Sequence, residues 1–329
     1  MNQITDLLAT FGEEVIDVDE ESFLLFAQEI PTNNLGMLDP RAPSVEITIK
    51  DNEYTIHQSP SLLSSHRAGG TTGAVLWKIT PRFAEWITNP TNPLWTHNLL
   101  SQSSTIAELG TGISALVALV LAPSVHHYIA TDQEYVRKLF RTNLDANASA
   151  SLSAGSDTSK AKGKGKGAKQ SRSKATSALG SNAKAVNNIS FTTLDWETDQ
   201  AASLKDCMDS DKVGTSSQEE EDEDKGFDLL LSCDCIYNEA LVAPFVRTCA
   251  EICRLRPAYA SGSEEGLRSR RRPTVCIIAQ QQRSPDVFET WLRETMREFR
   301  VWRVSDDVLG EGLRSGSGYL VHLLLVKGQ

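Results

Sequence analysis

The stretch that decides the fold is Ile106-Ala107-Glu108-Leu109-Gly110-Thr111-Gly112. A short apolar run at 104–109 ends in this glycine-rich turn, and the apolar segment 113–122 follows and stops at Pro123, as a buried helix would. Gly110 and Gly112 have no Cβ, so a ligand can approach the backbone closely there. The stretch therefore predicts a strand, a tight turn and a helix, where ligand crevices open in parallel sheets.

Strands and helices alternate on both sides of this turn. The expected strands are 104–109, 127–131, 189–194, 227–232, 275–279, 301–304 and 319–326, and the expected helices are 113–122, 136–144, 239–255 and 284–299. This alternation indicates an α/β fold, a parallel sheet with helices on both faces. About 14 polar and Gly-rich residues join the last two strands. They are too few for a crossover helix, so we expect a terminal antiparallel strand pair.

Three segments lack the apolar side chains that a packed core needs. The first, 148–185, consists mainly of Ala, Ser, Gly and Lys; the second, 199–226, contains six consecutive acids; and the third, 257–273, is polar and basic. We expect all three to be low-complexity inserts. The remaining chain suits one domain at 71–329, preceded by an N-terminal extension at 1–70.

Composition and charge narrow the class of protein. The 329 residues are 40% hydrophobic, enough for a sizeable core, and the net charge of −10 argues mildly against a dedicated nucleic-acid binder. No apolar run approaches the roughly 20 residues of a membrane helix. The start carries acids where a targeting peptide has bases. The six cysteines include no C-x-x-C pair, so reduced core thiols are expected instead of a metal site. These features favour a cytoplasmic, monomeric protein with no membrane partner, and the nucleus is an alternative location.

An acid follows the glycine-rich turn at an informative distance. Asp132 ends the second expected strand, twenty residues after Gly112, where a carboxylate can accept hydrogen bonds from both ribose hydroxyls of a nucleotide. Nicotinamide dinucleotide binding also fits this pattern, and a structural turn beside a solvent-facing Asp is a third interpretation. Glu108, two residues before Gly110, favours another cofactor. E-x-G-x-G resembles the motif of S-adenosylmethionine-dependent methyltransferases, in which the acid contacts or orients the methionine end.

Further motifs occur in the order expected of one family. They are Thr72-Gly73-Ala74-Val75-Leu76-Trp77, ELGTGIS, ATDQ, LDWE and Asp234-Cys235-Ile236-Tyr237-Asn238-Glu239. The series resembles the seven-strand protein-lysine methyltransferases (family 16), and within them the fungal ribosomal-protein lysine methyltransferases. D-x-x-Y is the most specific marker. The resemblance covers 70–147, 189–255 and 274–326, and it implies a Rossmann-like seven-strand sheet.

The resemblance also implies a cofactor, a substrate and a role for each residue. The cofactor is S-adenosyl-L-methionine, and its expected contacts are Trp77, Glu108, Gly110, Thr111, Gly112, Asp132, Asp195, Trp196 and Cys233. Asp195 and Trp196 would hold the adenine, and Cys233 would contribute a backbone contact. Asp234 and Tyr237 are the expected catalytic residues, one attracting a lysine cation and the other positioning its amine. The implied substrate is a lysine side chain of a ribosomal protein, and no metal is needed.

Several alternatives remain open. The substrate could instead be a translation factor, a chaperone, a small molecule or RNA, and a non-catalytic cofactor-binding module is a further alternative. Asp-Cys-Ile-Tyr at 234–237 differs from the Asn/Asp-Pro-Pro-Tyr/Phe motif of enzymes that modify nucleic-acid amino groups. The basic tract 160–174 is interpreted as a solvated insert, with weak contact to RNA or the ribosome as the sharper alternative. The target lysine and the number of methyl groups added stay open.

Overall fold

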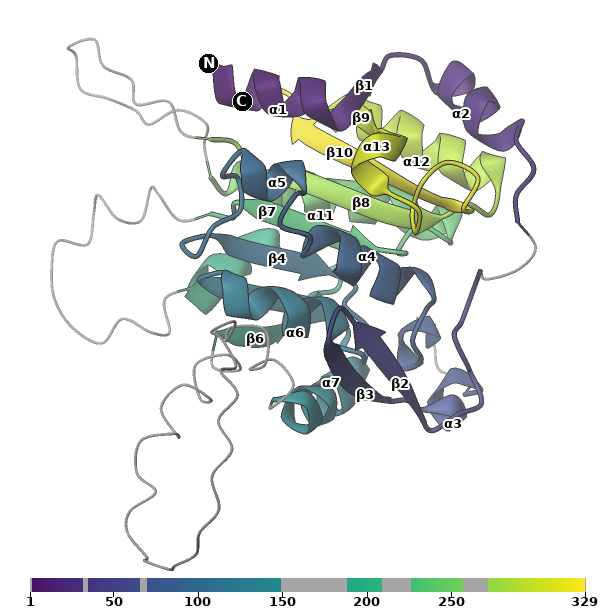
Figure 1. Ribbon diagram of the computed structural model, residues 1–329, viewed down its shortest axis with the longest axis vertical. Coiled ribbons are helices and arrows are strands. Elements are labelled where there is room, and N and C mark those ends of the chain that lie inside the picture. The colour runs from purple at the N-terminus through teal and green to yellow at the C-terminus, as the bar shows by residue number, and fades with distance from the viewer. Residues whose placement is uncertain are drawn as a thin grey trace, which may run out of the picture.

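An eight-stranded sheet with helices on both faces forms the centre of the protein (Figure 1). The computed structural model describes residues 2–31, 35–65, 70–148, 188–208, 226–256 and 272–328. In spatial order the strands are β1 (Gly12–Val15), β9 (Phe299–Val304), β10 (Tyr319–Val326), β8 (Val275–Gln281), β7 (Leu229–Cys233), β4 (Thr105–Leu109), β5 (His127–Asp132) and β6 (Ile189–Thr193). The expected α/β class is confirmed.

The direction of the strands identifies the kind of sheet. β6, β5, β4, β7 and β8 run parallel, and β10 runs antiparallel to both β8 and β9. Counted along the chain from β4, the order from β6 to β9 is 3-2-1-4-5-7-6. This is the Rossmann-like methyltransferase sheet, and the expected terminal antiparallel pair is confirmed. The last strand, β10, lies between β8 and β9 in the sheet.

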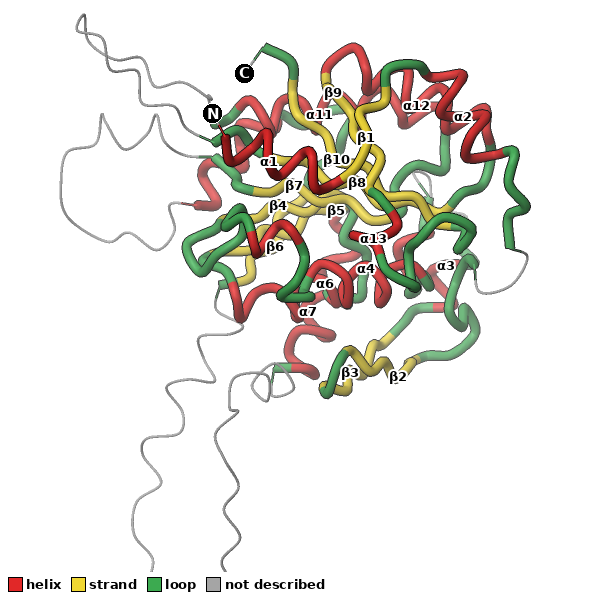
Figure 2. Tube along the Cα trace, turned by 45° about the horizontal axis from the view of Figure 1, so that its top comes forward, coloured by secondary structure: helices red, strands yellow, loops and turns green. Residues whose placement is uncertain are grey.

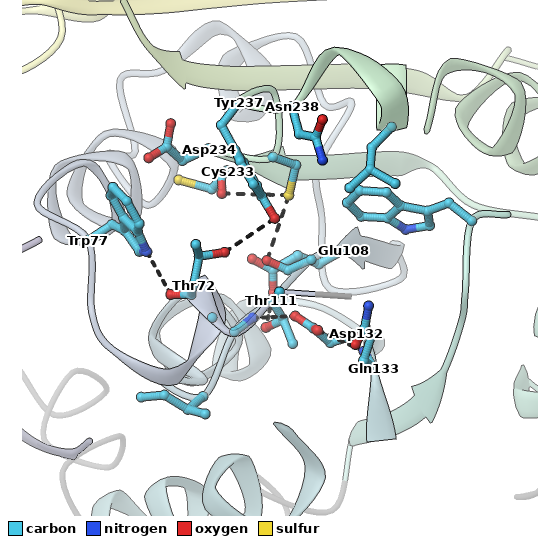
Figure 3. A pocket seen from close by; sticks show the side chains of 18 of the residues that line it. Thr72, Trp77, Glu108, Thr111, Asp132, Gln133, Cys233, Asp234, Tyr237 and Asn238 are labelled. Atoms are coloured by element: carbon cyan, nitrogen blue, oxygen red, sulfur yellow. Dashed lines mark hydrogen bonds between the residues drawn. The ribbon is translucent and has the colours of Figure 1, made fainter. Parts of the chain in front are cut away.

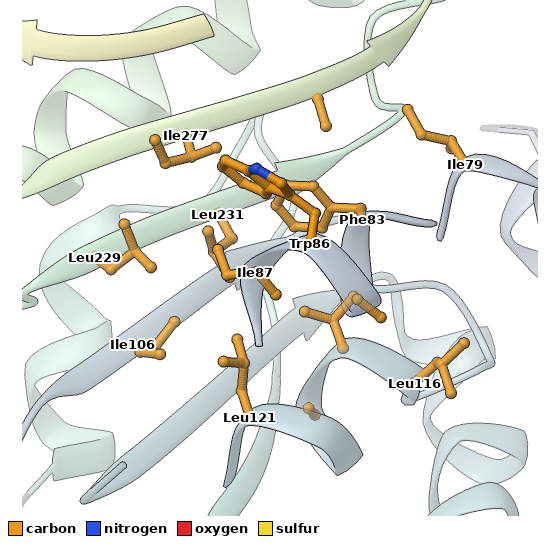
Figure 4. Packing of buried hydrophobic residues seen from close by; sticks show 14 of the residues in the cluster. Ile79, Phe83, Trp86, Ile87, Ile106, Leu116, Leu121, Leu229, Leu231 and Ile277 are labelled. Carbon is orange, nitrogen blue, oxygen red and sulfur yellow. The ribbon is translucent and has the colours of Figure 1, made fainter. Parts of the chain in front are cut away.

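Two helical layers cover the sheet because its strands are apolar on both faces. In β7, the side chains of Leu229 and Leu231 join the core on one face and that of Leu230 joins the core on the other. Figure 4 shows Phe83 and Ile87 of the covering helix above the first face. The first layer holds α1 (Asn2–Phe11), α4 (Ile79–Ile87), α5 (Pro93–Thr96), α6 (Leu116–Leu121) and α7 (Glu134–Asn147), and the second holds α2 (Val18–Phe26), α11 (Val242–Arg254) and α12 (Pro285–Glu298).

The N-terminal segment packs closely against the parallel sheet. Its strand β1 pairs antiparallel with β9, from Gly12 opposite Val304 to Val15 opposite Val301. The sequence of β1, GEEV, has neither strand nor helix periodicity, so only pairing with β9 reveals it. The hairpin of β2 (Ser44–Ile49) and β3 (Asn52–His57) lies beside α7 in Figure 2. A domain boundary at residue 70 stays a prediction.

Two buried asparagines of α7 fasten this hairpin. Asn143 accepts a hydrogen bond from the backbone N–H of His57 at 2.8 Å and donates one to its carbonyl at 3.0 Å. Asn147 does the same for Thr55, at 2.8 and 2.9 Å. Each carboxamide thus satisfies a donor and an acceptor of β3, as a neighbouring strand would.

Parts of the three expected inserts, 149–187, 209–225 and 257–271, lie outside the described residues. The second insert was expected from residue 199, and that start is wrong. Ala201–Met208 form a 3-10 helix, η4, whose Ala201 and Leu204 are buried with α11. Their spacing of three residues aligns both side chains on one face of such a helix. None of the described helices combines the length and the apolar composition of a transmembrane span.

The remaining short elements connect these layers. They are α3 (Pro60–Leu63), α13 (Asp306–Leu309), η1 (Thr72–Ala74), η2 (Ala122–Ser124) and η6 (Glu239–Leu241). η1 and η6 approach the carboxyl ends of the parallel strands, and they contribute to the cavity found there.

Candidate active site

A cavity of about 430 Å³ opens at the carboxyl ends of β4, β5, β6 and β7 (Figure 3). Parallel α/β sheets bind ligands at this edge, where the strand order reverses. All eleven residues expected from the sequence line the cavity: Trp77, Glu108, Gly110, Thr111, Gly112, Asp132, Asp195, Trp196, Cys233, Asp234 and Tyr237. The fold thus brings together five motifs that are far apart in the sequence.

The turn after β4 favours glycine at two positions. Gly110 has φ +68° and Gly112 has φ +62°, a region that side chains with a Cβ rarely adopt. A Cβ at Gly110 would overlap the Sγ of Cys235, and a Cβ at Gly112 would lie 3.4 Å from the carbonyl oxygen of Gly73. The turn therefore leaves its backbone close to the cavity and open to a ligand.

Asp132, at the end of β5, is held in a fixed orientation. Its Oδ2 accepts a hydrogen bond from the N–H of Gly112 at 2.8 Å, and its Oδ1 accepts one from the N–H of Gln133 at 2.7 Å. Burial raises the pKa of Asp132 to about 6, although both backbone hydrogen bonds oppose this rise. The carboxylate is therefore mainly ionised at neutral pH, and each oxygen keeps a lone pair for a hydroxyl donor.

Glu108 is a carboxylate buried beneath the turn, with 2% of its surface exposed. Its Oε2 accepts hydrogen bonds from the hydroxyls of Thr111 at 2.6 Å and Tyr128 at 2.9 Å. Burial raises the pKa of Glu108 to about 7, the two hydroxyls oppose the rise, and nearby Asp132 adds to it. A positively charged group in the cavity would favour the ionised form, so this end suits a cationic ligand.

Trp196, after β6, forms the opposite wall. Its ring meets the ring of Phe245 edge-on at 5.0 Å between centroids. Its buried Nε1 finds no hydrogen-bond acceptor among the described residues. The benzo-ring atoms of Trp196 lie nearest the turn at Gly110, so this wall presents an aromatic surface to a ligand. Asp195 beside it is exposed, and its Oδ1 accepts a hydrogen bond from the N–H of Glu197 at 2.9 Å.

Five residues form a chain of contacts at the other end of the cavity, which we call the collar: Tyr237, Thr72, Trp77, Arg283 and Asp234. The Thr72 hydroxyl donates to the Tyr237 hydroxyl at 3.2 Å, and the Trp77 indole donates to the Thr72 carbonyl at 3.0 Å (Figure 3). The Arg283 guanidinium lies 5.1 Å from the centre of the Trp77 ring. Arg283 also donates to both carboxylate oxygens of Asp234, each at 2.6 Å.

The charge of Asp234 is therefore already neutralised. The side chain is buried, accepts a further hydrogen bond from the N–H of Gln281 at 2.9 Å, and belongs to a residue with φ +66°. The expectation that Asp234 attracts a lysine cation directly does not fit this pairing. Its contacts instead fix the loop that carries Tyr237, because Arg283 anchors that loop to the end of β8.

The cysteines near the cavity serve packing. Cys233 lines it, and the Sγ of Cys235 lies 3.4 Å from the carbonyl oxygen of Leu109. Burial raises the pKa of both thiols, so neither is a thiolate at neutral pH. All six cysteines are reduced thiols. Within the described ranges, no group of three His, Cys, Asp or Glu side chains could hold a metal ion.

Sequence reasoning missed two members of the collar, Thr72 and Arg283. Thr72 stands in a motif that was singled out for its glycine and tryptophan. Arg283 lies in the run QQQRSPD before α12, outside every motif, and nothing in its spacing relates it to Asp234. One signal was available. Asp234 directly follows an apolar strand, and acids buried in proteins are paired, so a cationic partner could have been expected for it.

The strand order, the E-x-G-x-G turn and the acid at the end of β5 give the protein the seven-strand methyltransferase fold and its cofactor motif. The particular relatives it resembles are fungal ribosomal lysine N-methyltransferases 5. The protein of that name from Zygosaccharomyces rouxii is 27% identical, and the match covers 75% of this chain and 72% of that protein. The one from Vanderwaltozyma polyspora is 25% identical, with 90% and 96% covered. The resemblance expected from the motifs is thus confirmed.

The chain also resembles a deaminase over part of its length, and a solved methyltransferase structure at low sequence identity. A diaminohydroxyphosphoribosylamino-pyrimidine deaminase from Schizosaccharomyces pombe is 37% identical over 134 residues, which are 40% of this chain and 32% of that protein. This chain thus spans about a third of the deaminase. Among solved structures, a SAM-dependent methyltransferase from Streptococcus mutans has a TM-score of 0.40 at 11% identity, covering 91% of this chain and 56% of that one. No family model matches the chain.

Proposed function

We propose that the protein is an S-adenosyl-L-methionine-dependent protein-lysine N-methyltransferase that acts on a ribosomal protein. The observation that carries the proposal is the meeting of E-x-G-x-G, Asp132 and the D-x-x-Y loop in one cavity. The likeness to ribosomal lysine N-methyltransferases 5 over most of the chain supports the substrate class. A cytoplasmic location and a monomeric state belong to the same proposal.

The cavity fits the cofactor at each of its three parts. Asp132 has free lone pairs for the two ribose hydroxyls, and its orientation is fixed by backbone hydrogen bonds. Glu108, which gains from a neighbouring positive charge, would face the methionine end together with Thr111. Trp196 offers its ring as an apolar wall for the adenine, beside Asp195. The glycine turn, Trp77 and Cys233 complete the wall.

When bound, S-adenosyl-L-methionine would supply a methyl group on a sulfonium, and the lysine nitrogen bonds to that carbon as the carbon–sulfur bond breaks. Only the neutral amine has the lone pair for this step. With a reference pKa near 10.4, about 0.1% of lysine is neutral near pH 7.4. The site therefore has to let a proton leave to water and then align the amine.

Tyr237 is the side chain placed to orient that amine. Its hydroxyl already accepts a hydrogen bond from Thr72 and keeps a second lone pair for an N–H of the substrate. Burial raises the pKa of Tyr237, so it stays a neutral phenol and orients the amine without acting as a base. Asp234 and Arg283 hold the loop in register, so most of the acceleration comes from proximity and alignment.

Calorimetry and a labelling experiment test the proposal together. The protein should bind S-adenosyl-L-methionine and S-adenosyl-L-homocysteine but not NAD. Incubated with cell extract and labelled cofactor, it should label a protein band that survives ribonuclease, and mass spectrometry should find the methyl group on a lysine of a ribosomal protein. Binding of NAD alone, or label only in RNA or small molecules, would refute it.

A tyrosine variant separates catalysis from cofactor binding. Tyr237→Phe should lower the rate of methyl transfer about tenfold or more, since the amine loses its alignment, while cofactor affinity changes little. Tyr54→Phe is the matched control, because Tyr54 lies in the β2–β3 hairpin, outside the cavity lining. Full activity of Tyr237→Phe would remove Tyr237 from the mechanism.

The proposed contact of the basic tract 160–174 with RNA or the ribosome concerns residues outside the described ranges. It stays a prediction, which deletion of the tract and measurement of binding to ribosomes would test.

A further inference from the structure

We infer that a groove beside the collar docks a basic, extended segment of the protein substrate, next to the lysine that is methylated. The inference rests on the proposed function and adds the surface by which the substrate is recognised. The groove lies between the end of α2, the loop after β7 and the start of α12, and its lining includes Phe26, Ile236, Tyr237, Val287 and Phe288.

The groove adjoins the catalytic cavity at Tyr237. Tyr237 lines both, and Arg283 of the collar also lines the groove. A polypeptide lying in the groove would therefore contact Tyr237 and Arg283, two members of the collar. A lysine side chain reaching from it could enter the cavity beside the Tyr237 hydroxyl, while its neighbours stay outside.

Two exposed apolar side chains, Phe23 and Leu24, lie on α2, the helix that contributes Phe26 to the groove. Among the described residues, the large hydrophobic side chains that are most exposed are Ile16 at 80%, Phe23 at 71%, Leu24 at 44% and Tyr237 at 39%. Phe23 precedes Phe26 by three residues, so the two are neighbours on the helix surface. Both ribbon views place α2 alongside α12.

The helix that carries this surface is held rigidly. The rings of Phe26 and Phe288 are 5.5 Å apart, and the Ser22 hydroxyl donates to Glu289 at 2.7 Å. Leu25 and Ser22 are buried on the inner side of α2. Phe23 thus stays exposed on a fixed support, as a docking side chain would, and burying it on binding stabilises a complex by removing apolar surface from water.

The charges around the groove select a cationic partner. Exposed carboxylates stand on every element that frames it: Glu20 on α2, Glu239 after β7 and Asp286 at the start of α12. Asp19 of α2 is already paired with Arg293 of α12, at 3.6 Å. The nearest cation of the groove lining, Arg283, is already neutralised by Asp234. Carboxylates beside exposed aromatic and aliphatic side chains favour a segment with Lys or Arg interspersed with apolar residues over a second copy of this acidic chain.

Binding of a defined peptide tests the surface directly. The probe is a fluorescent ten-residue peptide of alternating arginine and leucine, and its control has glutamate in place of arginine. Fluorescence anisotropy should show binding of the arginine peptide only, weakening as salt rises. Phe23→Ser and Asp286→Lys should each raise its Kd at least tenfold. Glu53→Lys, which reverses an exposed carboxylate on the distant strand β3, should not change it.

Methylation assays connect docking to the reaction. With acid-extracted ribosomal protein, both variants should raise KM at least tenfold and keep kcat, whereas their rate with N-acetyl-lysine methylamide and their cofactor affinity should equal those of the parent protein. If the parent protein bound the arginine–leucine peptide but methylated no ribosomal protein, that result would contradict the proposed function and still support the docking surface. Unchanged Kd and KM in both variants would overturn the docking surface, as would dimers in sedimentation that Phe23→Ser dissolves.

Discussion

The two halves of the cavity differ in the contacts that form their walls. At the ends of β4 and β5 the wall consists of backbone in glycine conformations and of two carboxylates fixed by local hydrogen bonds. At the ends of β7 and β8 the wall is the collar, in which side chains from three distant segments contact one another. The first half is thus set by the local chain, and the second by tertiary contacts.

This difference matches two tasks. The cofactor half receives a ligand of constant shape, so a rigid turn that tolerates no side chain is suitable. Under the proposed function, the collar half admits a lysine of another protein and aligns it, and hydrogen bonds between side chains can adjust to that. The comparison predicts that changes in the first half abolish binding, whereas changes in the second lower rates.

The largest effect is expected at the turn. Gly110→Ala would place a Cβ against the Sγ of Cys235 at φ +68°, so cofactor affinity should fall at least about a hundredfold in calorimetry. Gly316→Ala is the matched control, because Gly316 has φ +77° but open space around it. It should cost only backbone strain, about 1–2 kcal/mol of stability. Equal affinity losses in both variants would assign the effect to strain alone.

Asp132→Ala should have the next largest effect. It removes two charge-assisted hydrogen bonds to the ribose, and cofactor binding should weaken by about 2–4 kcal/mol. The ionised form is the acceptor and the pKa is about 6, so affinity of the parent protein should fall as the pH drops through 6. Asp132→Asn should lose this step and keep the step that Glu108 contributes near pH 7. If a folded Asp132→Ala protein bound the cofactor with unchanged affinity, Asp132 would have no role in cofactor binding.

Arg283 tests the collar half. Arg283→Met leaves the Asp234 charge buried and unpaired, so stability should fall by about 3 kcal/mol and the methyl-transfer rate about tenfold, with little change in cofactor affinity. Adding Asp234→Asn removes that charge and should restore much of the stability, but not the rate. Chemical denaturation and single-turnover kinetics measure the two quantities. Full activity of Arg283→Met would show that the collar needs no guanidinium.

The smallest effect is expected at Glu108, where substitution should raise the stability of the protein instead of lowering it. Because folding raises the Glu108 pKa from 4.5 to about 7, the stabilising contribution of this group is full below pH 4.5 and is lost as the pH rises through 7. Above pH 8, Glu108→Gln removes an ionisation cost of about 3 kcal/mol. It also weakens the hydrogen bonds from Thr111 and Tyr128, which offsets part of this gain. The cofactor-free protein should therefore be stabilised by roughly 1 kcal/mol, about 2–4 °C in Tm. The gain should vanish near pH 4.5, and cofactor binding should weaken. A loss of stability at pH 8 would contradict the burial argument.

The sequence predicted the cofactor half of the cavity well, because local features determine it. Glycines at positive φ, an acid at the end of a strand and apolar runs of strand length are all visible in the chain. The alternation of strands and helices likewise predicted the sheet and the antiparallel end. The helix expected at 113–122 begins only at Leu116, because Ala115 adopts φ +55° and extends the turn.

The remaining features depend on contacts between distant segments. Asp234 looked like an unpaired acid because its partner, Arg283, lies 49 positions further along. β1 has a strand's backbone but the composition of a loop, and only its pairing with β9 makes it a strand. Local periodicity carries no information about such pairs.

The asparagines of α7 have a consequence for the length of the chain beyond them. Asn143 and Asn147 fix the end of that helix to β3, and Asn188, just before β6, donates to the carbonyls of Ala122 and Val125 at 2.7 and 3.1 Å. Both ends of the connection between α7 and β6 are thus anchored independently of it. The entropy of closing a loop grows only with the logarithm of its length. Residues can therefore be added or removed there at little thermodynamic cost, and a reporter domain inserted at this point should leave the cavity intact.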